Sequence, residues 1–231
     1  QFVQIDREIP AVFKSALGKL SDMFDDVSVF GGCLTDSMIG RRKIHDIDAH
    51  VRMNNFQALP TPVQMDILRN TSAGQRAPSS LSSDAFREWT GLQLTEIFHD
   101  QIYYRLRFLM DDPDRTEIDL SIYRDHYLRD NADTPFHLLP IKRCAANFTC
   151  ASYSKEGIWA HASYEDSIAD MSMHIFRDRG LRASVWSLSY YDHVKRKYPE
   201  LRLQNPELIA YRAANRFMER FSSEKLTPKN T

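Results

Sequence analysis

The chain has 231 residues, of which 42% are hydrophobic and 26% are charged, and its formal net charge is −1. These values are ordinary for a globular chain with one large domain or two small ones, and they do not indicate a generally basic nucleic-acid binder. No apolar run approaches the roughly 20 residues that cross a bilayer, and three cysteines without a Cys-x-x-Cys pair indicate reduced thiols, so we expect a cytoplasmic protein without membrane contact.

The first third of the chain predicts alternating helices and strands. Apolar residues at helical spacing favour helices, whereas a Val-rich run and a period of two favour strands. The predicted elements are, in order, a helix over 8–24, a strand over 27–30, a tight turn at Gly31-Gly32, a short helix over 37–42 that ends near Gly40, and a strand over 46–53.

The rest of the chain predicts a loop, a hairpin and then helices. A polar stretch rich in Ser, Ala and Gly favours a flexible loop, and the alternating runs around Asp-Asp-Pro-Asp favour a hairpin. The predicted elements are a loop over 70–84, a helix over 85–98, a hairpin of strands 102–108 and 118–122 around a turn at 111–114, and helices after 163, one of them opening at Asn205-Pro206.

Charge is divided unevenly between the two parts of the chain. Residues 177–231 carry 12 Lys and Arg against 6 Asp and Glu, a net of +6, which leaves −7 for residues 1–176. This division fits an acidic, metal-binding domain followed by a region that faces a polyanion such as RNA, while a solvated helical tail would have the same pattern.

Two aspartates on one predicted strand indicate a metal site. Asp46 and Asp48 lie two residues apart, so their carboxylates point to the same face, roughly 6.5–7 Å apart along the backbone. Because neighbouring anions repel, this arrangement favours a bound Mg²⁺ or Mn²⁺ ion, for which oxygen ligands are suited. Asp119, on the second strand of the predicted hairpin, would be a third carboxylate. Three carboxylates on neighbouring strands could hold two ions, the arrangement used for in-line phosphoryl or nucleotidyl displacement.

The Gly31-Gly32 turn predicts a phosphate contact. Glycine lets the backbone approach a phosphate closely, and the first amides of a following helix favour anions. A glycine pair or a D-x-D pair alone is weak, but the sequence places a strand, the glycine pair and a strand that opens with Asp-Ile-Asp in succession. Together they indicate a site that binds phosphate and metal.

The run from Val29 to Asp48 resembles the signature of the DNA polymerase beta-like nucleotidyltransferases, and more closely the head domain of bacterial poly(A) polymerases and CCA-adding enzymes. The matching residues are Gly31, Gly32, Asp36, Gly40, Arg41, Asp46 and Asp48. The resemblance implies an α+β fold, in which helices flank a mixed β-sheet and a small helical neck-like region follows. It implies a catalytic head over 1–162 and a basic neck-like region over 163–231.

The resemblance also implies roles for residues outside this run. Asp46, Asp48 and Asp119 would be the catalytic metal ligands for two ions. Besides the glycine pair, the residues implied to bind nucleotide, ATP among the candidates, are Asp36, Arg41, Arg124, Arg143, Asn147, Asp192 and Lys195. The chain departs from the family pattern at Thr35, where the family has arginine, and in the later motifs.

Three functions therefore stay open. The first is transfer of a nucleoside monophosphate from a triphosphate to an acceptor hydroxyl such as an RNA 3′ end, with RNA held by the basic C-terminal region. The second is nucleotidylation of a small molecule or a protein. The third is a non-catalytic descendant that binds a nucleotide or a partner protein.

Neighbouring polar residues have simpler interpretations. We expect His50 to be a surface residue or to support the ligands from behind, and Glu117 to lie at the rim of the site. Cys33 is expected to be a small buried hydrophobe. The C-terminal aromatic residues at helical spacing are expected to be core: Trp186, Tyr190, Tyr191 and Tyr198.

Overall fold

The computed structural model describes residues 1–40, 44, 46–52, 61, 77–78, 93–99, 103–110, 115–176 and 181–224. These residues divide into two compact units. The first contains residues 1–143 and 149–162, and the second contains residues 144–148 and 163–231. The short 3-10 turn η3 (Asn147–Thr149) lies at a boundary between them.

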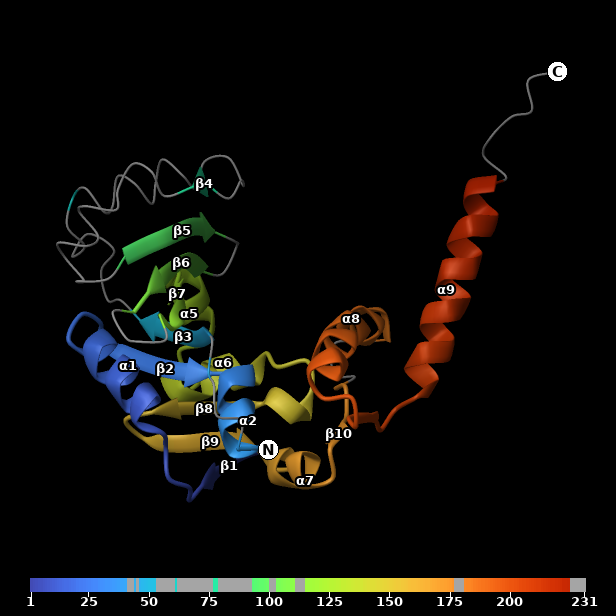
Figure 1. Ribbon diagram of the computed structural model, residues 1–231. Coiled ribbons are helices and arrows are strands. Elements are labelled where there is room, and N and C mark those ends of the chain that lie inside the picture. The colour runs from blue at the N-terminus through green and yellow to red at the C-terminus, as the bar shows by residue number, and fades with distance from the viewer. Residues whose placement is uncertain are drawn as a thin grey trace. The chain divides into compact units, whose positions relative to one another are not determined.

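The first unit is built on a mixed sheet, which has nine strands within the described residues (Figure 1). The strands are, in chain order, β1 (Phe2–Ile5), β2 (Asp26–Phe30), β3 (Asp46–Arg52), β4 (Ala77–Pro78), β5 (Gln93–His99), β6 (Tyr103–Leu109), β7 (Glu117–Tyr123), β8 (Ala151–Ser154) and β9 (Gly157–His161). Their order across the sheet is β1-β9-β8-β2-β3-β7-β6-β5-β4. Of these pairs only β3 and β7 run parallel, and together with the flanking helices this confirms the predicted α+β fold class.

Alternation along β3 and β7 separates an apolar face from a polar one. Ile47, Ala49 and Val51 on β3 are fully buried. Ile118 on β7 is also fully buried, and Leu120 is 1% exposed. The helix α1 (Ala11–Ser21) packs against β2 and buries its own apolar stripe. Burial of this stripe and of the strand face excludes water from the core and stabilises the sheet.

The polar face of the sheet is covered at one end. Tyr123, at the end of β7, stacks on Tyr127 of α5 (Asp125–Asp130) with ring centroids 5.2 Å apart. It also contacts Phe136 of the 3-10 helix η2 (Phe136–Leu138), at 5.9 Å between centroids. A short helix, α6 (Leu139–Lys142), follows η2. These elements therefore lie over the C-terminal end of β7.

Most predicted elements of this unit are confirmed, and two are wrong in part. The short helix α2 (Gly32–Met38) begins five residues before the predicted 37–42, because Gly31 turns the chain sharply at φ 89°. The predicted helix over 85–98 is wrong at its end, where β5 pairs with β6. Pairing with a strand supplies backbone hydrogen bonds that outweigh a local helical pattern. The predicted hairpin is confirmed by the antiparallel pairing of β6 and β7.

Several predictions fall on residues outside the described ranges. The loop over 70–84 does so apart from β4, and so do the first part of the helix over 85–98 and the turn at 111–114. The short strand β1 and the β8–β9 hairpin were not predicted, although Gly157 adopts a positive φ of 95° at the hairpin turn.

The second unit is mainly helical. It contains α7 (Tyr164–Ala169), α8 (Leu181–Lys197), α9 (Glu207–Glu224) and a small parallel pair of strands, β10 (Ser172–Met173) and β11 (Arg202–Leu203). Tyr198 is buried and contacts Phe148 at 5.5 Å between ring centroids, in line with its predicted core role. No helix of the described residues is long and apolar enough to cross a membrane.

A buried asparagine joins two segments of this unit. The predicted helix at Asn205-Pro206 does begin there, as α9, but the Asn205 side chain bonds the backbone of Ile175. Its Oδ1 accepts from the Ile175 amide at 3.1 Å, and its Nδ2 donates to the Ile175 carbonyl at 2.9 Å. The asparagine thereby satisfies both backbone groups of one buried residue.

We predict that Asn205→Ala destabilises the protein by about 2–4 kcal/mol, because it leaves two backbone groups without these hydrogen bonds. Gln204→Ala is the matched control. It removes a hydrogen bond to Ser172 from a side chain at the surface and should cost at most about 1 kcal/mol. Urea unfolding followed by circular dichroism measures both, and equal effects of the two substitutions would contradict the role of Asn205.

Candidate active site

The carboxylates of β3 lie at the open end of the polar face. Along this face the side chains change from exposed at Asp46 to half-buried at Asp48 and buried at His50. The gradient follows from the cover described above, since α5 and η2 lie over the far end of the sheet. Asp46 and Asp48 are therefore open to a ligand, while the floor behind them is closed.

Strand register brings a third carboxylate to the same place. Because β3 and β7 are parallel and in register, Asp48 lies beside Asp119 and Asp46 beside Glu117. Neighbouring strands are about 4.8 Å apart, so these side chains are close neighbours on one face. The structure thus brings together the three predicted catalytic aspartates, although Asp119 lies more than 70 residues after Asp46 and Asp48 in the chain.

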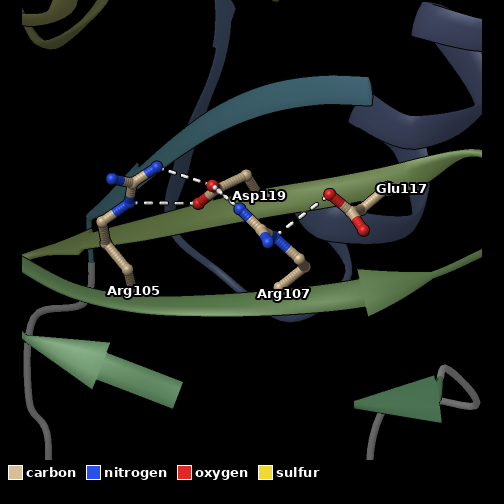
Figure 2. A network of polar contacts seen from close by, with 4 residues as sticks. All are labelled: Arg105, Arg107, Glu117 and Asp119. Atoms are coloured by element: carbon tan, nitrogen blue, oxygen red, sulfur yellow. Dashed lines mark hydrogen bonds and ion pairs between the residues drawn. The ribbon is translucent and has the colours of Figure 1, made fainter. Parts of the chain in front are cut away.

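Two arginines on β6 bind the third carboxylate (Figure 2). Arg105 donates from Nε to Oδ1 of Asp119 at 3.1 Å and from Nη2 to Oδ2 at 2.6 Å. Arg107 donates from Nη2 to Oδ2 at 3.2 Å, and its Nε forms an ion pair with Glu117 at 3.1 Å. Asp119 is therefore neutralised by two guanidinium groups, and Glu117, which is 35% exposed, lies at the rim as predicted.

Asp48 is in a different electrostatic position. Burial, together with the negative charges of Asp119 and Asp46, raises the pKa of Asp48 to about 7. The positive charges of Arg105 and Arg107 act in the opposite direction but do not overcome it. The positive charge around Asp48 is thus too small to offset the effects of burial and of the neighbouring carboxylates on its ionised form.

This arrangement fits a divalent cation at Asp46 and Asp48. A carboxylate whose ionisation is opposed by burial and by neighbouring carboxylates is stabilised when a cation binds it, and oxygen donors suit Mg²⁺ or Mn²⁺. Asp119 is already paired, and within the described residues no group of three or more His, Cys, Asp or Glu is placed to hold a metal. Asp46 and Asp48 could hold a cation, and both the bound metal and the number of ions stay predictions.

The glycine turn lies directly beside the carboxylates. Gly31 has φ 89° and ψ −145°, and a Cβ at this position would lie 3.5 Å from Oδ2 of Asp48. The Gly31 amide donates a hydrogen bond to the carbonyl oxygen of Ala151 at 3.1 Å, and this bond connects the turn to β8. A phosphate contact of the turn would therefore come from the amides that follow Gly31, at the start of α2. Cys33 is buried there as predicted, with its Sγ 3.4 Å from the carbonyl oxygen of Phe30.

A buried polar layer lies behind the carboxylates. His50 is buried rather than at the surface, and its Nδ1 lies 2.9 Å from the Tyr123 hydroxyl. Burial, together with the charges of Arg105 and Arg143, lowers the pKa of His50 to about 3, so the ring is neutral. The guanidinium of Arg143 lies 5.5 Å from the centroid of the Tyr127 ring. Arg143, predicted to bind nucleotide, thus lies on the carboxylate face of the sheet.

The other residues predicted to bind nucleotide in this unit are placed unequally. Asp36 is buried on α2, the helix that follows the glycine turn. Arg124 follows β7 at its C-terminal end, roughly 16 Å along the strand from Asp119, so the structure does not bring it next to the carboxylates. Arg41 lies outside the described residues.

The predicted nucleotide-binding residues of the second unit make contacts inside that unit. The buried Asn147 donates from Nδ2 to Ser163 at 3.2 Å and accepts at Oδ1 from the His174 amide at 2.7 Å. Asp192 on α8 pairs with Arg212 on α9, at 2.5 Å from Nη1 to Oδ2. Lys195 donates to the carbonyl of Leu201. Each side chain thus has a structural partner within its unit, and a role in nucleotide binding stays a prediction.

The arginine pair, Arg105 and Arg107, was not predicted from the sequence. A signal was present, because Arg-x-Arg on one strand of the predicted hairpin faces Glu-x-Asp on the other. With the observed register, Arg107 lies directly opposite Asp119 and Arg105 diagonally opposite. Opposite charges at such cross-strand positions attract.

Comparison with solved structures identifies the class of the fold. The chain is similar to a CCA-adding enzyme in complex with ATP, with a TM-score of 0.56 and 14% identity over 95% of this chain and 48% of that one. It is also similar to the Thermotoga maritima CCA-adding enzyme complexed with tRNA, with a TM-score of 0.54 and 14% identity over 95% of this chain and 47% of that one.

A third similar structure is an apo tRNA-processing enzyme, with a TM-score of 0.52 and 10% identity over 92% of this chain and 49% of that one. The chain spans about half the length of these proteins. No protein-family model and no curated protein matches the chain. At these identities the similarity shows the fold of a nucleotidyltransferase head.

We predict that Gly31→Ala destabilises the protein by about 1–3 kcal/mol, because an L-residue is strained at this positive φ. Gly32→Ala is the matched control, since a Cβ there would meet nothing within 4 Å and the residue begins a helix. That substitution should be close to neutral. Thermal unfolding of both variants tests the prediction, and a neutral Gly31→Ala would show that the turn does not need glycine.

Proposed function

We propose that this protein is a metal-dependent nucleotidyltransferase that transfers a nucleoside monophosphate from a triphosphate to an acceptor hydroxyl. The observation that carries the proposal is the position of Asp46 and Asp48. They lie at the open end of the polar face, beside the Gly31 turn and Asp119. The similarity of the fold to CCA-adding enzymes with ATP and with CTP supports the same reaction class.

In the proposed reaction the acceptor hydroxyl attacks the α-phosphate of the triphosphate. A new phosphorus–oxygen bond forms, the bond to the bridging oxygen breaks, and pyrophosphate leaves with its electron pair. The hydroxyl proton passes to a carboxylate of the site or to water. When bound, a divalent cation would neutralise the phosphate charge and polarise the α-phosphate.

The residues of this chain position the reactants. Asp46 and Asp48 would hold the cation, and the turn after Gly31 would hold phosphate through backbone amides. The buried layer of His50 and Tyr123, whose side chains lie within hydrogen-bonding distance of each other, closes the floor behind Asp48. Such fixed dipoles and charges need no reorganisation during the reaction, which is the main source of catalysis in sites of this kind.

An RNA 3′ end is the acceptor that we favour. The net charge of +6 over residues 177–231 supports attraction to a polyanion. The similarity to a CCA-adding enzyme complexed with tRNA extends over 95% of this chain, which includes most of that basic region. A small-molecule or protein acceptor would use the same carboxylates and would not need the basic region.

We predict that Asp46→Asn and Asp48→Asn each reduce metal-dependent transfer of α-labelled nucleotide by about a thousandfold or more, because one charged cation ligand is lost. The matched control is Asp22→Asn at the exposed end of α1, which should leave transfer unchanged. Gel or thin-layer assays with each of the four ribonucleoside triphosphates measure the transfer. Activity retained in both site variants would overturn the assignment of the active site.

We predict that RNA is labelled in preference to protein or small molecules when all are offered together with the labelled triphosphate. Transfer to RNA should fall steeply between about 50 and 200 mM salt, because phosphate contacts release counterions. Transfer that is insensitive to salt, or confined to protein or small molecules, would favour the second type of acceptor. Binding of triphosphate without any transfer would favour a non-catalytic protein.

A further inference from the structure

Asp119 is the most strongly paired carboxylate of the site. Both of its oxygens accept hydrogen bonds from Arg105, and Oδ2 also accepts from Arg107 (Figure 2). The Asp119 side chain is only 8% exposed, while those of Arg105 and Arg107 are 29% and 26% exposed. The carboxylate is thus enclosed, whereas part of each arginine side chain reaches solvent.

A divalent cation competes with the arginine pair for the Asp119 carboxylate, because the two arginines already donate three hydrogen bonds to its oxygens. Cation binding by carboxylate requires a lone pair on an oxygen, and bidentate pairing with Arg105 directs N–H groups at both oxygens. Positive guanidinium groups beside the carboxylate also repel an approaching cation. Asp119 is therefore a weak ligand for a cation while the arginine pair holds it, and a stronger one after the pair moves away.

We propose that the arginine pair exchanges Asp119 for the triphosphate when substrate binds. Asp119 becomes available to the divalent cation, and Arg105 and Arg107 bind the phosphate oxygens that arrive with it. This inference rests on the proposed function, because it concerns the same site. Both arginines would bind the triphosphate, and cation binding by Asp119 would depend on where the two arginines are paired.

In this exchange each arginine loses one anionic partner and gains another. The planar guanidinium group binds phosphate in the same bidentate manner as carboxylate, so each arginine replaces one anionic partner by another. Asp119 on β7 lies between Asp48 on β3 and the arginine pair on β6, and the charges of both arginines act to lower the pKa of Asp48. A triphosphate with its cation at Asp46 and Asp48 would therefore lie within reach of both guanidinium groups.

The exchange predicts how tightly the protein binds a cation without nucleotide. If Asp119 is held by the arginine pair about 90% of the time, its affinity for the cation is reduced about tenfold. Substrate removes this reduction, because the arginine pair then has phosphate as its partner. The wild-type protein should therefore bind Mn²⁺ weakly alone and more tightly with a non-hydrolysable triphosphate.

The test is a titration with Mn²⁺, followed by electron paramagnetic resonance of the free ion. The double variant R105K/R107K keeps both positive charges but loses the bidentate geometry, and R105Q/R107Q loses both. We expect both double variants to bind Mn²⁺ alone about tenfold more tightly than wild type, or with one more ion, and to lose most of the enhancement by triphosphate. Adding Asp119→Asn to either double variant should abolish the gain.

The outcomes separate the exchange from general electrostatics. A gain only in R105Q/R107Q would be an effect of net charge and would overturn the proposal, as would a gain that survives Asp119→Asn. Equal or weaker Mn²⁺ binding in both double variants would overturn it as well. Circular dichroism and thermal unfolding establish that each variant is folded, and the lysine variant retains the charge that Asp119 needs for folding.

The result is distinguishable from failure of the proposed function. The Mn²⁺ titration needs no acceptor and no turnover, so it tests the exchange even if no acceptor is ever labelled. Conversely, nucleotide transfer by a wild-type protein whose Mn²⁺ affinity does not depend on the arginine pair would leave the proposed function standing and refute the exchange.

Discussion

The crowding of like charges at the open end of β3 and β7 is the constraint on which the rest of the site depends. Parallel register places Asp48 beside Asp119, and alternation adds Asp46 on the same face. Unbalanced carboxylates at such distances would destabilise the fold. The arginine pair on β6 balances Asp119, and the cation of the proposed function would balance Asp46 and Asp48.

The surroundings of the carboxylates give them different roles. Asp119 is enclosed and paired, Asp48 is half-buried with a pKa raised to about 7, and Asp46 is exposed. Behind them, His50 and Tyr123 form a neutral floor on which α5 and η2 pack. A charged histidine at this place would repel a cation, so burial of a neutral ring is compatible with a metal site in front of it.

The second unit shows how the same residue types serve structure. Asn147 and Asn205 are buried, and both hold backbone groups of neighbouring segments in place. Asp192 and Lys195 join α8 to α9 and to the turn before β11. Amide and charged side chains are the natural partners of buried backbone groups, so a motif position alone does not separate a structural role from a binding role.

The sequence by itself determined the local features of the site. Alternation placed Asp46 and Asp48 on one face, the glycine pair marked the turn, and the hairpin placed Asp119 on a strand, because these depend on neighbours in the chain. Only the tertiary structure decided that β3 and β7 pair in register, that β5 is a strand and that the arginine pair holds Asp119. Those outcomes depend on strands that meet across long stretches of chain, and the energy of such pairing is absent from any local pattern.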